Sequence, residues 1–270
     1  MDRVALDLGI IKIYWYSIFI FLGILSACLV IYREAKKRNI DEDFLINIIF
    51  YSLILGIIGA RVYYVLFNLD YYLMRPIEII QVWNGGLAIH GGILTALIFI
   101  LFYCKKHNIH PLKILDIIVV GLIIGQSIGR WGNFFNSEAY GGITTLESLQ
   151  RIGLPHFIID GMYIMGEYRQ PTFLYESILC LIGFIFLLLL RKNKNLRNGQ
   201  LTGFYLIWYG TIRLIIETFR TDSLMLGPLK MAQLVSILFI IVGTYLMFYH
   251  FIKSTPKEEC LYYNKRKNKK

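Results

Sequence analysis

Residues 172–190 read TFLYESILCLIGFIFLLLL, an almost unbroken apolar run. A helix needs about 20 mostly apolar residues to cross the hydrocarbon core of a bilayer. Directly after this run come the basic residues Arg191, Lys192, Lys194 and Arg197. An apolar run followed by basic residues is typical of a transmembrane helix that ends at the cytoplasmic face.

Similar apolar runs recur along the whole chain. Hydrophobic residues make up 56% of the 270 residues, and the mean hydropathy is +0.56, which is above the range of soluble domains. The sequence therefore predicts an all-α membrane protein with about seven transmembrane helices. The predicted spans are Ile13–Tyr32, Phe44–Phe67, Leu87–Cys104, Ile114–Asn136, Thr172–Leu190, Leu201–Phe219 and Met231–Phe251. We expect residues 1–253 to form one transmembrane domain, without a repeat or a linker.

The distribution of basic residues sets the expected orientation. Basic residues follow the first, third and fifth spans and are frequent in residues 254–270. The loops after the second, fourth and sixth spans contain fewer basic residues. Because basic loops stay in the cytoplasm, we expect the N-terminus outside and the C-terminus inside. The segment Ser137–Gln170 is then a small extracytoplasmic cap between the fourth and fifth helices.

The net charge of +10 is explained by these loops and by the tail, so we do not expect nucleic-acid binding. We expect the tail to be disordered and to contact anionic lipid heads. Acidic as well as basic residues precede the first span, and no small-residue cleavage site follows it. We therefore expect a retained first helix and not a removed signal peptide.

The cysteines do not have the spacing of a zinc site or of a disulfide framework. They are Cys28, Cys104, Cys180 and Cys260. We interpret them as scattered small apolar residues, and a catalytic cysteine is the less favoured interpretation. No metal site is expected.

Polar residues within the spans share one depth in the predicted topology. Ionisable side chains are costly in a bilayer and by default indicate function. In this chain polar residues within the spans fall near the outer ends of those spans. These residues are Tyr16, Arg61, His90, Arg130, Asn133, Asn136, Arg213, Glu217 and, just beyond its span, Arg220. The sequence thus predicts a polar site in the outer leaflet.

Two spacings sharpen this prediction. Tyr209, Arg213 and Glu217 lie four residues apart and share one helix face; the alternative is an ion pair that only neutralises two charges for insertion. His90 precedes Gly91 and Gly92, which allow a backbone or a lipid headgroup to approach closely. The alternative for that motif is a small-residue contact between helices.

The richest polar stretch is residues 129–141, GRWGNFFNSEAYG. Its asparagines cannot continue a hydrocarbon span without partners, so its glycines indicate a helix that stops and turns across the site. A capped helix end at the interface is the alternative interpretation.

This stretch resembles the signature of the bacterial prolipoprotein diacylglyceryl transferases. The resemblance continues in order through nearly the whole chain. It includes Trp15-Tyr16, residues 59–64 (GARVYY), residues 83–92 (WNGGLAIHGG) and residues 209–220 (YGTIRLIIETFR). The family often has His-Pro-Ser/Thr-Gln-Leu-Tyr-Glu where this chain has residues 170–176, QPTFLYE. Gln170 and Phe173 replace a histidine and a glutamine, and the roles of those two side chains are not carried over.

The resemblance implies a reaction and its substrates. A diacylglyceryl group leaves phosphatidylglycerol and forms a thioether on the lipobox cysteine of a prolipoprotein, while glycerol 1-phosphate departs. The family works at the outer face of the bacterial inner membrane without a metal or another cofactor.

The implied chemistry assigns roles to the polar layer. We expect Arg130 and Arg213 to bind the phosphate, because guanidinium groups bind phosphate oxygens bidentately and stay charged. A thiol reacts as its thiolate, so a base is useful. His90 is the first candidate, and Glu217 is the alternative unless it orients Arg213. The other expected positioning or substrate-binding residues are Tyr16, Arg61, Asn133, Asn136, Glu138, Gly141, Tyr209 and Arg220.

Two other classes of protein fit part of the pattern. A secondary transporter for a small anion also uses buried arginines and glycine-broken helices, but its site lies near the bilayer midplane and its chain usually shows two similar halves. A membrane scaffold without enzymatic activity predicts that alanine at Arg130 leaves lipoprotein maturation intact.

Overall fold

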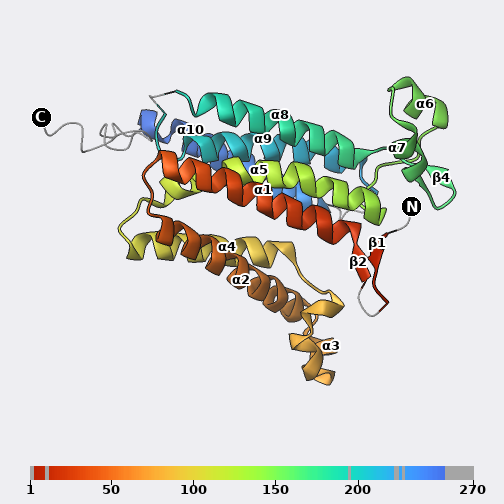
Figure 1. The fold of residues 1–270 in the computed structure, drawn as a ribbon, viewed down its shortest axis with the longest axis horizontal. Coiled ribbons are helices and arrows are strands. Elements are labelled where there is room, and N and C mark those ends of the chain that lie inside the picture. Colours follow the sequence, from red (N-terminus) through yellow and green to blue (C-terminus); the bar gives the residue numbers. More distant parts are fainter. Residues whose placement is uncertain (1–2, 10–11, 194–195, 222–224, 227–228, 253–270) are drawn as a thin grey trace, which may run out of the picture. The chain divides into compact units, whose positions relative to one another are not determined.

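The computed structural model describes residues 3–252, except for residues 10–11, 194–195, 222–224 and 227–228. The chain divides into two compact units, one of residues 1–31 and 115–270 and the other of residues 32–114. Both consist mainly of helices (Figure 1). Each unit is described by itself.

Long helices that pack through small residues build the first unit. Its described part contains α1 (Trp15–Lys37) up to residue 31, α5 (Pro111–Asn136) from residue 115, α8 (Thr172–Leu190), α9 (Gln200–Phe219) and α10 (Met231–Ile252). A Cβ on Gly23 of α1 would lie 2.9 Å from the carbonyl oxygen of Gly125 on α5. A Cβ on Gly243 of α10 would lie 2.7 Å from the carbonyl oxygen of Gly203 on α9. Glycine at these positions allows the backbones to approach closely, as is common between helices in lipid.

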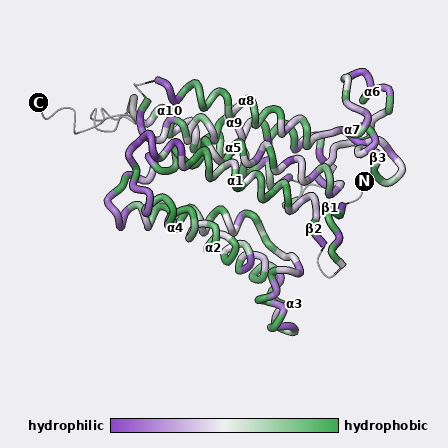
Figure 2. The backbone as a smooth tube through the Cα atoms, in the orientation of Figure 1, coloured by the Kyte–Doolittle hydropathy of each residue, from purple (hydrophilic) through white to green (hydrophobic). Residues whose placement is uncertain are grey.

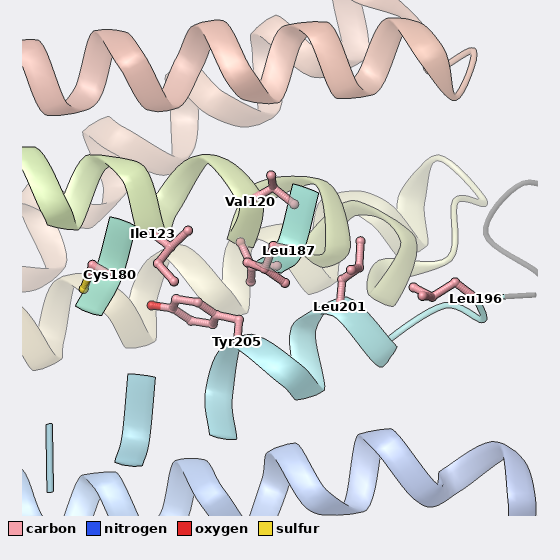
Figure 3. Packing of buried hydrophobic residues seen from close by; sticks show 8 residues of the cluster. Val120, Ile123, Cys180, Leu187, Leu196, Leu201 and Tyr205 are labelled. Carbon is pink, nitrogen blue, oxygen red and sulfur yellow. The ribbon is translucent and has the colours of Figure 1, made fainter. Parts of the chain in front are cut away.

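An apolar core joins α5, α8 and α9. Figure 3 shows its buried side chains Val120, Ile123, Cys180, Leu187, Leu196, Leu201 and Tyr205. The hydroxyl of Tyr205 accepts a hydrogen bond from Gln126 Nε2 at 2.9 Å, which satisfies a polar atom that is costly to bury alone. This core fixes how the three helices face one another.

A buried carboxylate on α5 also holds the N-terminal end of α9 in place. Asp116 of α5 accepts hydrogen bonds from the backbone N–H groups of Gly199 at 2.7 Å and Thr202 at 2.8 Å. These groups belong to the first turn of α9, whose N–H groups have no partner within the helix. Asp116 therefore acts as an N-cap supplied by another helix.

The segment Ser137–Gln170 folds into short elements. It contains α6 (Leu146–Arg151), α7 (His156–Gly161) and the antiparallel pair β3 (Tyr163–Ile164) and β4 (Glu167–Tyr168). The two helices are far too short to cross a membrane. The buried apolar cluster that holds the segment to the ends of α5 and α8 consists of Phe134, Leu149, Ile158, Ile159, Met162, Ile164 and Phe173.

The second unit is a helix pair with a connecting segment. α2 (Glu42–Phe67) is followed by α3 (Leu69–Met74), the 3₁₀ turns η1 (Pro76–Ile80) and η2 (Val82–Asn84), and α4 (Ile89–Lys106). α2 and α4 pack at glycines: a Cβ on Gly59 would overlap the side chain of Thr95. The third predicted span begins at Ile89 and not at Leu87, because Ala88 has φ of −93° and ψ of 112°, an extended conformation that a right-handed helix excludes.

Two further hairpins complete the described residues. β1 (Val4–Asp7) pairs with β2 (Lys12–Tyr14) before α1, and β5 (Met225–Leu226) pairs with β6 (Leu229–Lys230) before α10. The prediction of an all-α protein is thus confirmed as a mostly helical fold, to which short local hairpins are added.

Each of the seven predicted spans corresponds to a helix in the structure, although Ile13 and Tyr14 of the first belong to β2 and α1 begins at Trp15. Six are long and apolar enough to cross a membrane: α1, α2, α4, α5, α8 and residues 231–249 of α10. α9 is as long but carries Arg213 and Glu217, and it is not among the six. Figure 2 shows hydrophobic residues along the long helices and hydrophilic residues in many of the loops. The membrane-protein class is therefore confirmed, while the count of seven spans, the orientation and the side of the 137–170 segment stay predictions. The predicted disordered tail, residues 254–270, lies outside the described residues.

Candidate active site

Two arginines on different helices share one buried carboxylate. Arg130 of α5 donates a hydrogen bond from Nη2 to Oε1 of Glu176 on α8 at 2.5 Å. Arg213 of α9 donates from Nη1 to Oε2 of the same residue at 3.3 Å. The carboxylate of Glu176 therefore joins three helices of the first unit. Its side chain is 3% exposed, whereas those of Arg130 and Arg213 are 18% and 16% exposed.

Residues of α9 complete this ionic cluster. Arg213 Nη2 also pairs with Oε2 of Glu217 at 2.7 Å, one turn further along the helix. The hydroxyl of Tyr209, one turn back, accepts a hydrogen bond from Arg130 Nη2 at 3.2 Å. The predicted face of Tyr209, Arg213 and Glu217 is thus confirmed as a contiguous polar surface. Two guanidinium groups face two carboxylates, which reduces the cost of burying the four charges.

The end of α5 continues the polar network. Asn133 accepts a longer hydrogen bond from Arg130, at 3.5 Å, and donates to Oε1 of Glu138 at 2.8 Å. Asn136 donates to the other oxygen of Glu138 at 2.9 Å. The two asparagines therefore have the partner that an amide near a bilayer needs, and Glu138 lies between them.

The turn after α5 adopts an unusual backbone conformation. Ser137 and Ala139 have φ of 53° and 58°, in the left-handed region that residues other than glycine seldom occupy. The hydroxyl of Thr172 donates to the carbonyl oxygen of Ala139 at 2.5 Å. α5 therefore ends at Asn136 and the chain turns there, but at Ser137 and Ala139 and not at the glycines, because Gly129 and Gly132 lie within α5. The start of α8 holds the turn in place.

Gly141 and Arg220 lie where three chain segments meet. Gly141 donates its N–H to the carbonyl oxygen of Gln170 at 2.9 Å and forms an isolated β-bridge with Arg220. A Cβ on Gly141 would lie 2.8 Å from the Cβ of Gln170. Glycine is therefore needed here for close packing.

Tyr16 lies in the first turn of α1 against Gly132. A Cβ on Gly132 would be 3.2 Å from Cδ2 of the Tyr16 ring, so the glycine makes room for this tyrosine beside the end of α5. The structure therefore brings the predicted residues of α1, α5 and α9 to the same end of the first unit.

Two predicted residues belong to the second unit. His90 is half-buried in the first turn of α4. Arg61 of α2 donates four hydrogen bonds of 2.5–2.9 Å to backbone carbonyl oxygens of the segment between α3 and α4.

The two positions that depart from the family pattern, Gln170 before α8 and Phe173 in its first turn, have a packing explanation. Phe173 is buried and stacks on Phe134 with ring centroids 4.6 Å apart. It also meets Trp131 edge-on at 5.5 Å. Gln170 contributes its backbone, which bonds with Gly141 and Gly142. An aromatic side chain at position 173 therefore fills the apolar cluster under the 137–170 segment.

The described residues hold no group of three or more His, Cys, Asp or Glu side chains placed to bind a metal ion. Cys28, Cys104 and Cys180 are free thiols; Cys104 and Cys180 are fully buried. Cys260 lies outside the described residues.

Comparison with known proteins decides the family. The family described as prolipoprotein diacylglyceryl transferase matches residues 3–249. This chain belongs to the prolipoprotein diacylglyceryl transferase family. It is 46% identical to the phosphatidylglycerol–prolipoprotein diacylglyceryl transferase of Staphylococcus xylosus over 254 residues, which cover 94% of this chain and 91% of that protein. The proteins of the same name from Staphylococcus carnosus and Staphylococcus aureus strain MSSA476 are also 46% identical, over 95% of this chain and 93% and 91% of theirs.

The residue that joins the two arginines of this cluster was not among the expected site residues. Glu176 lies in the first turns of α8, within a predicted span, and an ionisable residue inside a span is by default a functional candidate. That signal could have identified it. Its two arginine partners are 46 and 37 residues away in the chain, so sequence spacing could not have shown the contact.

Proposed function

We propose that this chain transfers the diacylglyceryl group of phosphatidylglycerol to the thiol of the lipobox cysteine in prolipoproteins. The products are a thioether-linked prolipoprotein and glycerol 1-phosphate, and the reaction is the first step of lipoprotein maturation. Membership of the transferase family and the names of relatives that match over almost the whole chain support this activity.

The observation that carries the mechanism is the pair of arginines held by Glu176. The donor headgroup is an anionic phosphodiester, and cleavage of its carbon–oxygen bond increases the negative charge on the departing phosphate. Each guanidinium has five N–H donors in a fixed fork. Arg130 and Arg213 each direct part of this fork to Glu176 and are still partly exposed, so each has donors left for phosphate oxygens. We assign these two residues to the phosphate.

The acceptor chemistry needs a thiolate. The cysteine thiol loses its proton to a base, its sulfur attacks the glyceryl carbon, and the bond from that carbon to the phosphate oxygen breaks as glycerol 1-phosphate leaves. We assign His90 as the base on the strength of its His-Gly-Gly motif. Glu217 is the weaker candidate, because its buried carboxylate already pairs with Arg213 at 2.7 Å, and we assign it to orienting that arginine.

The surrounding polar residues have positioning roles in this proposal. Asn133, Asn136 and Glu138 form one hydrogen-bonded group beside Arg130, so they set the direction of its guanidinium. Tyr209 does the same from α9. Tyr16, Gly141 and Arg220 frame the donor site at the same end of the first unit.

We further propose that α9 is a seventh span and that the N-terminus is outside the bacterial inner membrane and the C-terminus in the cytoplasm. The basic loops support this orientation. The contacts of Arg213 with Glu176 and Glu217 support the insertion of α9, since paired charges are cheaper in a bilayer than single ones. Residues 1–253 are then the catalytic domain, the 137–170 segment is an extracytoplasmic cap, and the site faces the outer leaflet.

A defined reaction tests the proposed activity. The purified protein is incubated with vesicles of phosphatidylglycerol and a lipobox peptide, and mass spectrometry follows the peptide. We expect the mass of a diacylglyceryl group to be added at the cysteine. A peptide with serine at that position and vesicles of phosphatidylethanolamine serve as controls. Absence of the adduct with the cysteine peptide and phosphatidylglycerol would refute the proposal.

A further inference from the structure

The segment between α2 and α4 exposes an unusual amount of apolar surface. It comprises residues 69–88, which include α3, η1 and η2. Met74 and Trp83 are 86% and 74% exposed. The other large apolar side chains exposed along it are Leu69, Tyr71, Leu73, Ile77, Ile79, Ile80, Val82 and Leu87. Soluble surfaces seldom carry so many adjacent apolar groups, and such a patch marks a site of contact.

The polar groups of this segment are turned toward one another. Tyr71 donates its hydroxyl hydrogen to Glu78 at 2.8 Å, and Arg75 donates to the Tyr71 hydroxyl at 2.8 Å. Together with α2 the segment borders an open polar pocket of about 390 Å³, lined by Arg61, Tyr64, Asn68, Tyr71, Tyr72, Glu78, Asn84, Gly85 and Gly86. Large apolar side chains thus make up much of the exposed surface of the segment, and its polar side chains pair with one another although Arg75 and Glu78 are themselves partly exposed.

Arg61 donates hydrogen bonds to backbone carbonyl groups of the segment, which need such partners near lipid. Its Nε donates to the carbonyl oxygen of Ile79 at 2.8 Å, and its Nη1 donates to Gly85 at 2.8 Å and Gly86 at 2.9 Å. Its Nη2 donates to the carbonyl oxygen of Glu78 at 2.5 Å. The carbonyl oxygen of Glu78 also accepts from the backbone N–H of Gln81 at 3.1 Å, and each backbone group left unpaired in a bilayer costs several kcal/mol. One side chain therefore satisfies four backbone acceptors.

Two neighbouring residues fit closely around Arg61, whose four hydrogen bonds to the backbone are here called the Arg61 clamp. A Cβ on Gly86 would lie 2.5 Å from Nη1 of Arg61, so only glycine leaves the guanidinium its place. The ring of Tyr72 lies 5.1 Å from the guanidinium carbon, in range of a cation–π contact. Four of the five N–H donors of Arg61 are used, which leaves little capacity for a phosphate ligand.

The segment connects two candidate membrane-spanning helices. α2 and α4 are both long and apolar enough to cross a membrane, and the segment links the end of one to the beginning of the other. We therefore expect the segment at the membrane surface. Tryptophan and tyrosine are the side chains that favour this depth, and both occur on the segment.

We propose that residues 69–88 lie in the lipid headgroup region of the membrane, with Trp83 in contact with lipid, and that Arg61 holds them in that conformation. The partner of this surface is the lipid bilayer itself. Arg61 is a positioning residue for the segment and not a ligand of substrate. This inference does not depend on the proposed transfer reaction.

Fluorescence of Trp83 tests the lipid contact. The chain has four tryptophans, so the emission of Trp83 is obtained as the difference between the full chain and Trp83→Phe, both reconstituted in vesicles. We expect phosphatidylcholine brominated high on its acyl chains to remove most of this emission, and dissolved iodide to remove little. Strong quenching by iodide with weak quenching by the brominated lipid would overturn the proposal.

Two matched arginine substitutions test whether the Arg61 clamp holds the segment in its conformation. Arg61→Lys keeps the charge but loses the fork, so we expect Trp83 to become accessible to iodide. Arg75→Lys changes an exposed arginine of the same segment and should leave Trp83 protected. Protection that is unchanged in Arg61→Lys would overturn the role of Arg61. If Arg61→Lys fails to accumulate, Gly86→Ala perturbs the same contact, and the same shift toward iodide is expected; its absence also overturns the role.

Discussion

Replacement of Glu176 by glutamine tests the central ionic cluster. The amide has almost the same shape as the carboxylate but no charge, so the change isolates the electrostatic contribution. Arg213 keeps Glu217 as an anionic partner at 2.7 Å. Arg130 keeps only the hydroxyl of Tyr209 at 3.2 Å and the more distant amide of Asn133. We therefore expect Arg130 to be the residue that moves.

The size of the effect follows from burial. Loss of one partner from a buried ion pair destabilises a protein by about 3–5 kcal/mol. The glutamine oxygen can still accept from one guanidinium, so the loss of stability lies near the lower limit, about 3 kcal/mol. Displacement of a positioned group by about 1 Å can lower a rate about 100-fold. We expect a decrease of that size in kcat for diacylglyceryl transfer.

Transfer to a lipobox peptide and thermal unfolding in detergent measure the two effects separately. The control is Glu167→Gln, since Glu167 pairs with Arg169 at 2.8 Å but is 46% exposed. An exposed ion pair contributes about 0–1 kcal/mol, so this variant should keep both activity and unfolding temperature. If Glu176→Gln matches the unsubstituted chain in both measurements, the reasoning about the shared carboxylate is wrong.

Three other substitutions give independent predictions. Arg130→Lys keeps the charge but loses the planar fork, and we expect kcat/KM to fall about 100- to 1000-fold in the peptide assay, as for loss of an electrostatic donor; near-normal turnover would remove Arg130 from phosphate binding. His90→Gln should abolish alkylation of the thiol while bound phosphatidylglycerol is still detected in the purified protein, and unchanged alkylation would exclude His90 as the base. Phe173→Gln restores a residue that the family often has, but it places an amide against Phe134; we expect a loss of about 1–3 kcal/mol in stability, as for a buried polar group without a partner, together with faster proteolysis in the 137–170 segment. Unchanged proteolysis would contradict the packing role of Phe173.

The helices could be predicted from the sequence because each depends on its own residues. A run of about 20 apolar residues must form a helix in a bilayer, where backbone groups can pair only within the segment. α8 accordingly has the predicted bounds, Thr172–Leu190. The start of α4 was predicted two residues early, because hydropathy does not register the extended backbone of Ala88.

The partners of polar side chains could be predicted only in part. Tyr209, Arg213 and Glu217 share a face by their spacing alone, because a helix repeats about every 3.6 residues. The contact of Arg130 with Glu176 depends on how α5 and α8 are rotated about their axes. The packing of their apolar core decides that rotation, and no local pattern encodes it.

Arg61 shows most clearly where sequence reasoning ends. Its place within a span marked it as a functional candidate, since a charge there needs a partner. The expected partner was an anionic substrate, yet its donors bind backbone carbonyl oxygens of residues 78–86. The sequence shows which side chains are present. It does not show which backbone carbonyl groups need a partner, because that depends on how the chain between two helices folds. By itself, the sequence determined the helices, the family and the residues that carry charge into the membrane. Only the tertiary structure decided which of those charges face one another and which hold the backbone in place.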